Sequence, residues 1–208
     1  MTRTLYYIHD PMCSWCWAFR PTFEKINSSL PVEINTQFIL GGLAPDTDQP
    51  MPEDMRKYIQ NQWRKIQQQV KGIKFNFEFW NKCSPRRSTY PACRAVIAAR
   101  NQDPEYEDKM VYAIQRGYYL EARNPSESET LKEFAREIGL DIEQFQSDMD
   151  SSDTEKTLQQ EIKFSRKLGV NSFPALVLNT GKKYQRLNID YGYPESILTE
   201  LNNSISPG

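Results

Sequence analysis

One stretch decides how this chain folds and reacts: Ile8-His9-Asp10-Pro11-Met12-Cys13-Ser14-Trp15-Cys16-Trp17-Ala18-Phe19. It follows an apolar run and places two cysteines three residues apart at the start of a predicted helix. On a helix this spacing puts both sulfurs on one face, about one turn apart. The first thiol lies at the helix N-terminus, where free backbone N–H groups and the helix dipole favour a thiolate. Cys13 and Cys16 are therefore predicted to form a redox pair, in which Cys13 attacks and Cys16 resolves the mixed disulfide.

The overall composition is that of a folded protein with balanced charge. Of 208 residues, 38% are hydrophobic and 12% are aromatic, which is enough for a core. The formal net charge is -1, from 26 basic and 27 acidic residues, and no long block of like charge occurs. Neither nucleic acid nor an anionic membrane surface is therefore expected as the main partner.

The N-terminus carries no recognisable targeting signal. The apolar run Leu5–Ile8 is too short for a signal peptide, and no stretch approaches the roughly 18 apolar residues of a membrane span. We therefore expect a cytoplasmic protein, and in that compartment thiols are kept reduced. The four cysteines are then expected to serve chemistry or metal binding rather than two structural disulfides.

Hydrophobic patterning predicts a β-α-β unit at the start of the chain. Residues 5–8 and 32–40 are predicted strands, and a helix over residues 13–28 lies between them, with Pro21 in its path as a kink. This order is the unit that forms a parallel pair of strands with a right-handed crossover.

The middle of the chain is predicted to be mostly helical. Apolar residues at three- and four-residue spacing predict a helix from Met55 that ends before Gly72. Residues 73–79 alternate like an isolated extended segment, and their phenylalanines are interpreted as packing between sheet and insertion. Further helices are expected over residues 91–121 and 154–168. Two capping boxes are predicted between them, and these are Ser126 with Glu129 and Asp141 with Gln144.

The C-terminal part returns to strands and ends in a helix. Residues 175–178 and 183–188 are predicted to form a hairpin, and Pro194 opens a terminal helix. The full order is βαβ, helical insertion, ββα. We divide it into a first domain made of residues 1–50 and 165–208 and an inserted helical domain of residues 51–164.

This order resembles the thioredoxin fold, because Cys-x-x-Cys stands at the first strand-to-helix junction and a proline precedes the third strand. The size of the insertion resembles the DsbA-like branch of that fold. Asp10-Pro11-Met12-Cys13-Ser14-Trp15-Cys16-Trp17 and Gly169-Val170-Asn171-Ser172-Phe173-Pro174 are most similar to its cytosolic, FrnE-like members, known as predicted protein-disulfide isomerases. The resemblance covers essentially the whole chain. It implies an α/β architecture, a thioredoxin fold with a large all-helical insertion.

The resemblance also implies roles for residues outside the cysteine pair. It implies that the Phe173–Pro174 bond is cis and faces the thiols, which leaves the Phe173 backbone free to pair with a substrate strand. Trp15, together with Trp17, is expected to offer an apolar surface to the substrate. Thioredoxin-like proteins often carry a buried carboxylate six residues before the first cysteine. Tyr7 stands at that place here, so the proton acceptor for the second thiol is unassigned.

Other reactive side chains have competing interpretations. His9, the only histidine, either acts as proton or thiolate partner or packs at the strand end. Asp10 opposes a thiolate if it lies close and charged. No metal site is expected, because Cys83 and Cys93 lie far from the first cysteine pair in the sequence. They are interpreted as bystander thiols, with a site-lining role for Cys93 as the alternative.

The expected function is that of a thiol–disulfide oxidoreductase or isomerase with no tightly bound cofactor. Glutathione is expected as a redox partner, and protein or peptide thiols and disulfides as substrates; the direction of the reaction stays open. The rival is a glutathione-dependent isomerase or transferase of the 2-hydroxychromene-2-carboxylate isomerase or kappa type. Those similar proteins use a serine at the motif, and Ser88-Thr89-Tyr90-Pro91-Ala92-Cys93-Arg94 resembles their Asn-Thr-x-x-Ala-His-Arg stretch, with Cys93 in place of the histidine. A third alternative is a binding or chaperone-like module with a peptide groove in the insertion.

Overall fold

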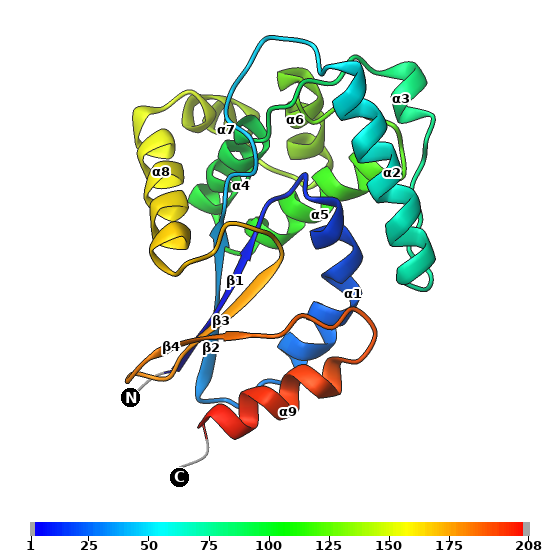
Figure 1. The fold of residues 1–208 in the computed structure, drawn as a ribbon. Helices are drawn as coiled ribbons and strands as arrows, with labels where there is room; N and C mark the ends of the chain where they lie inside the picture. Colours follow the sequence, from blue (N-terminus) through cyan, green and yellow to red (C-terminus); the bar gives the residue numbers. More distant parts are fainter. Residues whose placement is uncertain (1–2, 206–208) are drawn as a thin grey trace.

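Four strands from the two ends of the chain form one mixed sheet (Figure 1). The computed structural model describes residues 3–205. The sheet order is β2-β1-β3-β4, in which β1 pairs with β2 in parallel and with β3 antiparallel, and β3 pairs with β4 antiparallel. The strand bounds are β1 Arg3–His9, β2 Ile34–Leu40, β3 Ala175–Asn179 and β4 Tyr184–Leu187. The strand predictions at both ends of the chain are confirmed.

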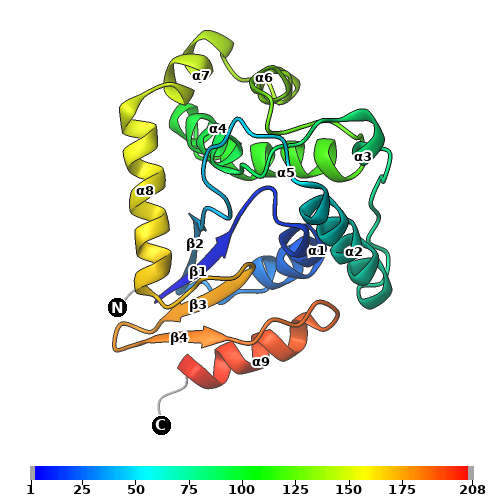
Figure 2. The ribbon, with the colours of Figure 1, turned by 45° about the horizontal axis from the view of Figure 1, so that its top comes forward.

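Side-chain alternation along β1 gives the sheet two packed faces. Leu5 and Tyr7 belong to a buried cluster with α1 (Ser14–Ser28) and α9 (Pro194–Ile205). Tyr6 points the other way, and its ring lies 5.1 Å from that of Phe164 in α8 (Ser152–Lys167). The sheet is therefore covered by α1 and α9 on one face and by α8 on the other (Figure 2).

The remaining helices gather at the end of the sheet where β1 leads into α1 (Figure 1). They are α2 (Glu53–Gln69), α3 (Phe79–Lys82), α4 (Tyr90–Gln102), α5 (Tyr106–Tyr119), α6 (Ser128–Glu137) and α7 (Ile142–Met149). One buried cluster joins these helices to Met12 in the turn after β1, Ala18 in α1 and Leu40 in β2. The loop that carries the first cysteine is thus covered by the insertion. Within residues 3–205, no helix is both long and apolar enough to cross a membrane.

Trp63 is the centre of the insertion's aromatic core. It is fully buried, and its ring stacks on Phe75 at 4.9 Å and lies edge-on to Phe77 at 5.6 Å. Packing by these phenylalanines is confirmed, but their partners lie in α2 and α5 rather than in the sheet. The extended prediction for residues 73–79 is wrong at its end. The chain turns there, and Phe79 begins α3 beneath the same indole.

Local signals at helix starts had mixed success. Asp141 caps α7 as predicted, because its carboxylate accepts a hydrogen bond from Gln144 N–H at 2.9 Å. The Ser126 box is wrong: α6 begins after Glu127, and the Ser126 hydroxyl donates to Asn124 Oδ1 within the preceding loop. The helix predicted over residues 154–168 begins earlier, at Ser152. The division into two domains stays a prediction.

Candidate active site

Cys13 stands at the N-cap of α1, directly after the turn that follows β1. Its backbone is extended, with φ −82° and ψ 117°, and its N–H donates to the Asp10 carbonyl at 3.0 Å. Its own carbonyl accepts the first helical bond, from Trp17 N–H at 3.0 Å. No side chain caps the helix, so the first-turn N–H groups are left to face the sulfur or a ligand. Cys16 lies one turn along and is buried at 1% exposure.

The Phe173–Pro174 segment lies against the first thiol. The Phe173–Pro174 peptide bond is cis, and Cys13 Sγ is 3.5 Å from the Phe173 carbonyl oxygen, to which the thiol donates. Cys13 and Phe173 share a buried cluster with Cys16. The cis bond at Phe173–Pro174 is confirmed, and the chain brings Phe173 against the first cysteine although the two motifs are far apart in the sequence.

Asp10 is a fully buried carboxylate that fixes the turn before Cys13. Its Oδ1 accepts from Met12 N–H at 2.8 Å, and its Oδ2 accepts from Leu43 N–H at 2.7 Å. The Thr89 hydroxyl also donates to Oδ2 at 2.7 Å, and the Cys93 thiol does so at 3.6 Å. The carboxylate therefore ties the β1–α1 turn to the end of β2 and to α4.

Burial dominates the acid–base properties of this region. Burial raises the pKa of the Asp10 carboxyl, and the hydrogen bonds it accepts only partly lower it again. Burial also raises the pKa of the Cys16 thiol well above its ordinary value, and the nearby Cys13 sulfur raises it further. A hydrogen bond with the Asp10 backbone lowers the pKa of Cys16, and the Asp10 charge raises it by less, so that charge does oppose a thiolate there. Cys16 is accordingly a thiol that ionises only when a reaction drives it.

Two hollows meet at Trp15, Ser172 and Phe173, and Cys13 lines one of them. A cavity of about 280 Å³ is lined by Cys13, Trp15 and Phe173 together with α2 side chains and Arg87. A second hollow of about 690 Å³ is lined by Trp15, Phe173 and Pro174 on the β4 side. Trp15 and Phe173 thus lie between the two, where a substrate at Cys13 would contact them. Trp17 instead stacks on Tyr119 at 5.8 Å, away from both hollows.

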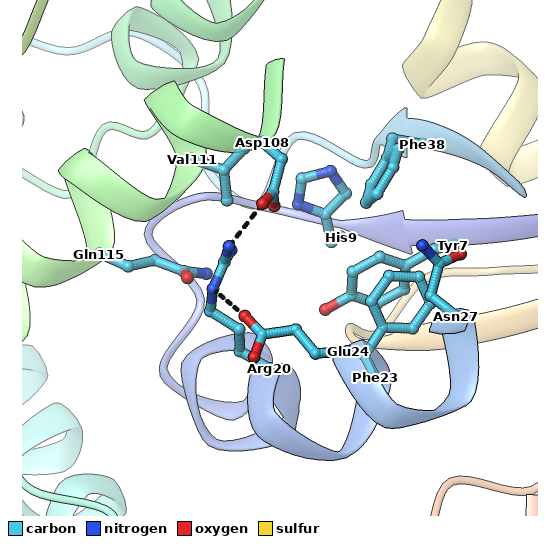
Figure 3. A pocket seen from close by; sticks show the side chains of 10 residues that line it. All are labelled: Tyr7, His9, Arg20, Phe23, Glu24, Asn27, Phe38, Asp108, Val111 and Gln115. Carbon is cyan, nitrogen blue, oxygen red and sulfur yellow. Dashed lines mark hydrogen bonds and ion pairs between the residues drawn. The ribbon is translucent and has the colours of Figure 1, made fainter. Parts of the chain in front are cut away.

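His9 lies in a different pocket from the thiols (Figure 3). Its ring stacks on Tyr7 at 5.0 Å, and the pocket of about 70 Å³ beside it is closed by Arg20, which is paired with Asp108 and Glu24. Neither ring nitrogen has a hydrogen-bond partner within residues 3–205, and burial lowers the pKa of His9 to about 4. The geometry therefore favours packing at the strand end over partnership with the thiolate.

The remaining cysteines lie outside the hollow at Cys13. Cys93 is completely buried against Asp10, and Cys83 donates to the Ala122 carbonyl at 3.2 Å. Burial raises the pKa of both thiols. In the described part of the chain no group of three metal-ligating side chains comes together. Cys93 thus contacts Asp10 and does not line the cavity at Cys13.

These features agree with the family to which the sequence points. A family model described as thioredoxin matches residues 6–199, which include both cysteines of the first motif and the Phe173–Pro174 segment. The chain belongs to the thioredoxin family.

Solved structures of family members cover nearly the whole chain. A candidate protein disulfide isomerase from Nitrosomonas europaea is 27% identical with a TM-score of 0.84, covering 98% of this chain and 97% of that one. Cytosolic disulfide reductase DsbM from Pseudomonas aeruginosa is 24% identical with a TM-score of 0.78, covering 97% and 98%. DsbM has also been solved with GSH, at 23% identity, a TM-score of 0.76 and the same coverage. These likenesses confirm the DsbA-like thioredoxin fold with its helical insertion.

Curated relatives carry a different description. ClpXP adapter protein SpxH of Halalkalibacterium halodurans is 23% identical over 202 residues, and SpxH of Shouchella clausii is 25% identical over 202 residues. Each match covers 95% of this chain and 65% of the relative. The chain thus spans less than two thirds of the length of these adapter proteins.

Sequence reasoning missed three contributors to the site. Thr89 and Arg87 come from the segment that leads into α4, and Tyr119 from α5 donates its hydroxyl to the Met12 carbonyl at 2.7 Å. The stretch around Thr89 had been noted only for its resemblance to the kappa-type proteins. Nothing in the spacing of these residues signals that the insertion folds over Cys13.

Proposed function

We propose that the protein is a thiol–disulfide oxidoreductase in which Cys13 is the attacking thiol and Cys16 the resolving thiol. One observation supports this most strongly: Cys13 occupies the N-cap position of α1 with its sulfur 3.5 Å from the Phe173 carbonyl oxygen, while Cys16 lies buried one turn further along the helix. The backbone at Phe173 is then available to hold an extended substrate across the attacking sulfur. Membership of the thioredoxin family supports the same chemistry.

The reaction proceeds by two exchanges. The Cys13 thiolate attacks one sulfur of a substrate disulfide, forms a mixed disulfide and releases the other sulfur as a thiolate. Cys16 then attacks the Cys13 sulfur, forms the Cys13–Cys16 disulfide and releases the second substrate thiolate, which takes up the proton that Cys16 gives up. The substrate gains two electrons and the protein loses two. Because burial holds Cys16 protonated, it loses its proton only in this second step.

Glutathione is the reductant that we propose for the return step. Two glutathione molecules reduce the Cys13–Cys16 disulfide and leave as glutathione disulfide, so that electrons and protons balance. The likeness to DsbM, a cytosolic disulfide reductase also solved with GSH, supports this partner and a cytoplasmic site of action. The same exchanges run in reverse if the redox potential is high, so an isomerase or oxidant uses the same residues.

Turnover of a small disulfide tests the proposal. Reduction of bis(2-hydroxyethyl) disulfide by glutathione is followed through the glutathione disulfide formed. We expect Cys13→Ser to abolish the catalysed rate and Cys16→Ser to lower it and accumulate the mixed disulfide, because glutathione must then resolve it in place of Cys16. Cys83→Ser serves as the matched control, since Cys83 lies outside the hollow at Cys13, and it should keep the wild-type rate. A Cys13→Ser variant as active as the wild type would refute the proposal.

A glutathione-dependent isomerase or transferase of the kappa type is the rival. Such proteins need only one reactive position at the motif, so the Cys16→Ser variant should retain their activity on a non-disulfide substrate. Survival of glutathione-dependent activity in that variant, with no disulfide exchange in the wild type, would favour this rival.

An adapter role is a second candidate, supported by the likeness to SpxH over 95% of the chain. Binding that depends on surface rather than on thiols should persist when Cys13 and Cys16 are both replaced by serine. Affinity for a purified partner protein, measured with and without both cysteines, separates the two functions. An unchanged affinity together with absent disulfide exchange in the wild type would assign the adapter role.

A further inference from the structure

Arg87 is a half-buried arginine in the wall of the cavity at Cys13. Within residues 3–205 its guanidinium has no hydrogen bond or ion pair. Other partly buried arginines are satisfied: Arg94 and Arg100 each bridge two carboxylates at 3.0 Å or less. An unpaired, partly desolvated charge is costly, so a ligand that supplies an acceptor would bind favourably.

The charged side chains that line the two hollows meeting at Trp15 and Phe173 are all positive. Among the described residues, Arg87 is the one charged side chain that lines the cavity of about 280 Å³. Arg186 is the one charged side chain that lines the hollow of about 690 Å³ across Trp15 and Phe173, and it donates to Ser172 Oγ at 3.4 Å. No acidic side chain of the described part of the chain lines either. The charged side chains on the walls of both hollows therefore favour an anionic substrate.

The chemistry of the guanidinium suits a planar oxyanion, and a carboxylate is the one that common thiols carry. Its planar set of N–H donors matches the two oxygens of a carboxylate, and such paired bonds are the stronger hydrogen bonds in proteins. Arg87 shares its cavity with Cys13 and with the polar side chains of Tyr58 and Gln62 from α2. The cavity lies near the lower end of the size range of small-molecule pockets, so a short acidic group fits it.

We propose that Arg87 binds a carboxylate carried by the disulfide substrate close to its reacting sulfur, an inference that rests on the proposed function of Cys13. The guanidinium then orients the substrate disulfide toward the Cys13 sulfur from the insertion side. Glutathione disulfide carries such carboxylates, and so does a peptide with glutamate beside its cysteine.

Three disulfides of different charge test this role, each with the neutral dithiol dithiothreitol as the reductant of the Cys13–Cys16 disulfide: glutathione disulfide, neutral bis(2-hydroxyethyl) disulfide and cationic cystamine. Arg87→Gln should raise KM for glutathione disulfide roughly 10-fold, the loss of one charged hydrogen-bonded contact, and leave kcat nearly unchanged. The neutral disulfide should be turned over as by the wild type. Arg87→Glu should reverse the preference and lower KM for cystamine. Arg136→Gln, an exposed arginine far along the insertion, is the control.

A binding measurement separates this proposal from the proposed function. S-methylglutathione has the carboxylates but no exchangeable sulfur, so its affinity can be measured by calorimetry whether or not the protein catalyses exchange. A roughly 10-fold weaker affinity in Arg87→Gln supports the proposal. Equal affinity in the wild type and Arg87→Gln, or equal losses with all three disulfides, would overturn it. Absent turnover of all three disulfides by the wild type would instead refute the redox function.

The source of the carboxylate is resolved by a second pair of substrates. One peptide disulfide carries glutamate beside each cysteine, and its twin carries glutamine. An Arg87→Gln effect on glutathione disulfide alone identifies a small thiol as the ligand, and an effect that extends to the glutamate peptide identifies an acidic peptide as well. Both results support a carboxylate contact. The absence of any charge-dependent effect on glutathione disulfide and on the glutamate peptide would contradict it.

Discussion

Two buried ionisable residues follow each other at the end of β1, and the fold treats them differently. Asp10 receives four donors and is held in place as part of the turn before Cys13. His9 receives none at its ring nitrogens within residues 3–205, and its ring stacks on Tyr7 and lies edge-on to Phe38. Sequence spacing identifies both as neighbours of the cysteines, but it does not tell which face of the strand each occupies relative to α1. The donors to Asp10 come from segments whose approach only tertiary packing decides.

The burial of His9 predicts a pH-dependent stability. Its pKa falls from 6.5 to about 4 on folding, so the unfolded chain binds a proton more readily between those values. Stability from neutral His9 is therefore complete above pH 6.5 and is lost as the pH falls toward 4. Between about pH 7 and about pH 4.5 the wild type should lose about 2–3 kcal/mol more unfolding free energy than His9→Gln. Urea unfolding at both pH values measures this.

Because carboxyl groups also titrate in this range, the comparison rests on the difference between the two proteins. His9 is the only histidine, so no second imidazole contributes. Parallel losses of unfolding free energy in the wild type and in His9→Gln would show that His9 is not held neutral by the fold.

At the scale of elements, hydrophobic periodicity predicted the strands and long helices well, whereas the paths of the loops were predicted poorly. The strands at both ends, α1 and α2 follow from hydrophobic spacing, because their buried residues repeat with the period of the element. The box at Ser126 failed because a nearby asparagine captures its hydroxyl. The turn after Phe77 was missed because aromatic packing around Trp63, rather than local preference, sets the path there.

Gly41, directly after β2, packs closely on the loop that carries Phe173 and Pro174, called the proline loop here. A Cβ at Gly41 would lie 2.0 Å from Phe173 Cε1, so Gly41→Ala must displace the Phe173 ring. The backbone carbonyl of the same residue contacts the Cys13 thiol. We expect a loss of about 1–3 kcal/mol in unfolding free energy, the usual range for overpacking. The displaced loop should also slow disulfide exchange. Denaturant unfolding and the disulfide-reduction assay measure the two effects.

Gly192→Ala is the matched control for this substitution. The nearest atom that its Cβ would meet is Asp190 Oδ1 at 3.9 Å, and stability and exchange rate should stay near those of the wild type. If Gly41→Ala behaves like Gly192→Ala in both assays, the close packing between β2 and the proline loop does not constrain the site.

At the scale of the whole molecule, the helical insertion forms part of the site itself. Thr89, Arg87 and Tyr119 all reach the turn at Cys13 or its cavity from the insertion. The sequence predicts that an insertion exists, because its helices have clear apolar faces. It does not predict which residues meet the cysteines, since those contacts join segments separated by dozens of positions. The sequence therefore predicted the cysteine pair of the site, but it did not predict the residues of the insertion that surround that pair.

Shared packing predicts cooperative unfolding of the whole chain. Met12, Ala18 and Leu40 belong to the same buried cluster as the insertion helices, so the core of the insertion is continuous with residues of the β1–α1–β2 unit. Urea unfolding followed by circular dichroism and by tryptophan fluorescence should give one transition with a common midpoint. In the Trp15→Phe, Trp17→Phe variant, fluorescence reports on Trp63 and Trp80 of the insertion alone. Separate midpoints for that signal and for circular dichroism would show two independent domains.

The central claim is that Cys13 attacks and Cys16 resolves. Mass spectrometry of the Cys16→Ser variant after incubation with glutathione disulfide tests it most directly. We predict one glutathione bound through Cys13 in that variant, none at Cys16 in Cys13→Ser, and a Cys13–Cys16 disulfide without bound glutathione in the wild type. Glutathione attached mainly to Cys83 in the Cys16→Ser variant, or a wild type in which Cys13 and Cys16 never join, would contradict the claim.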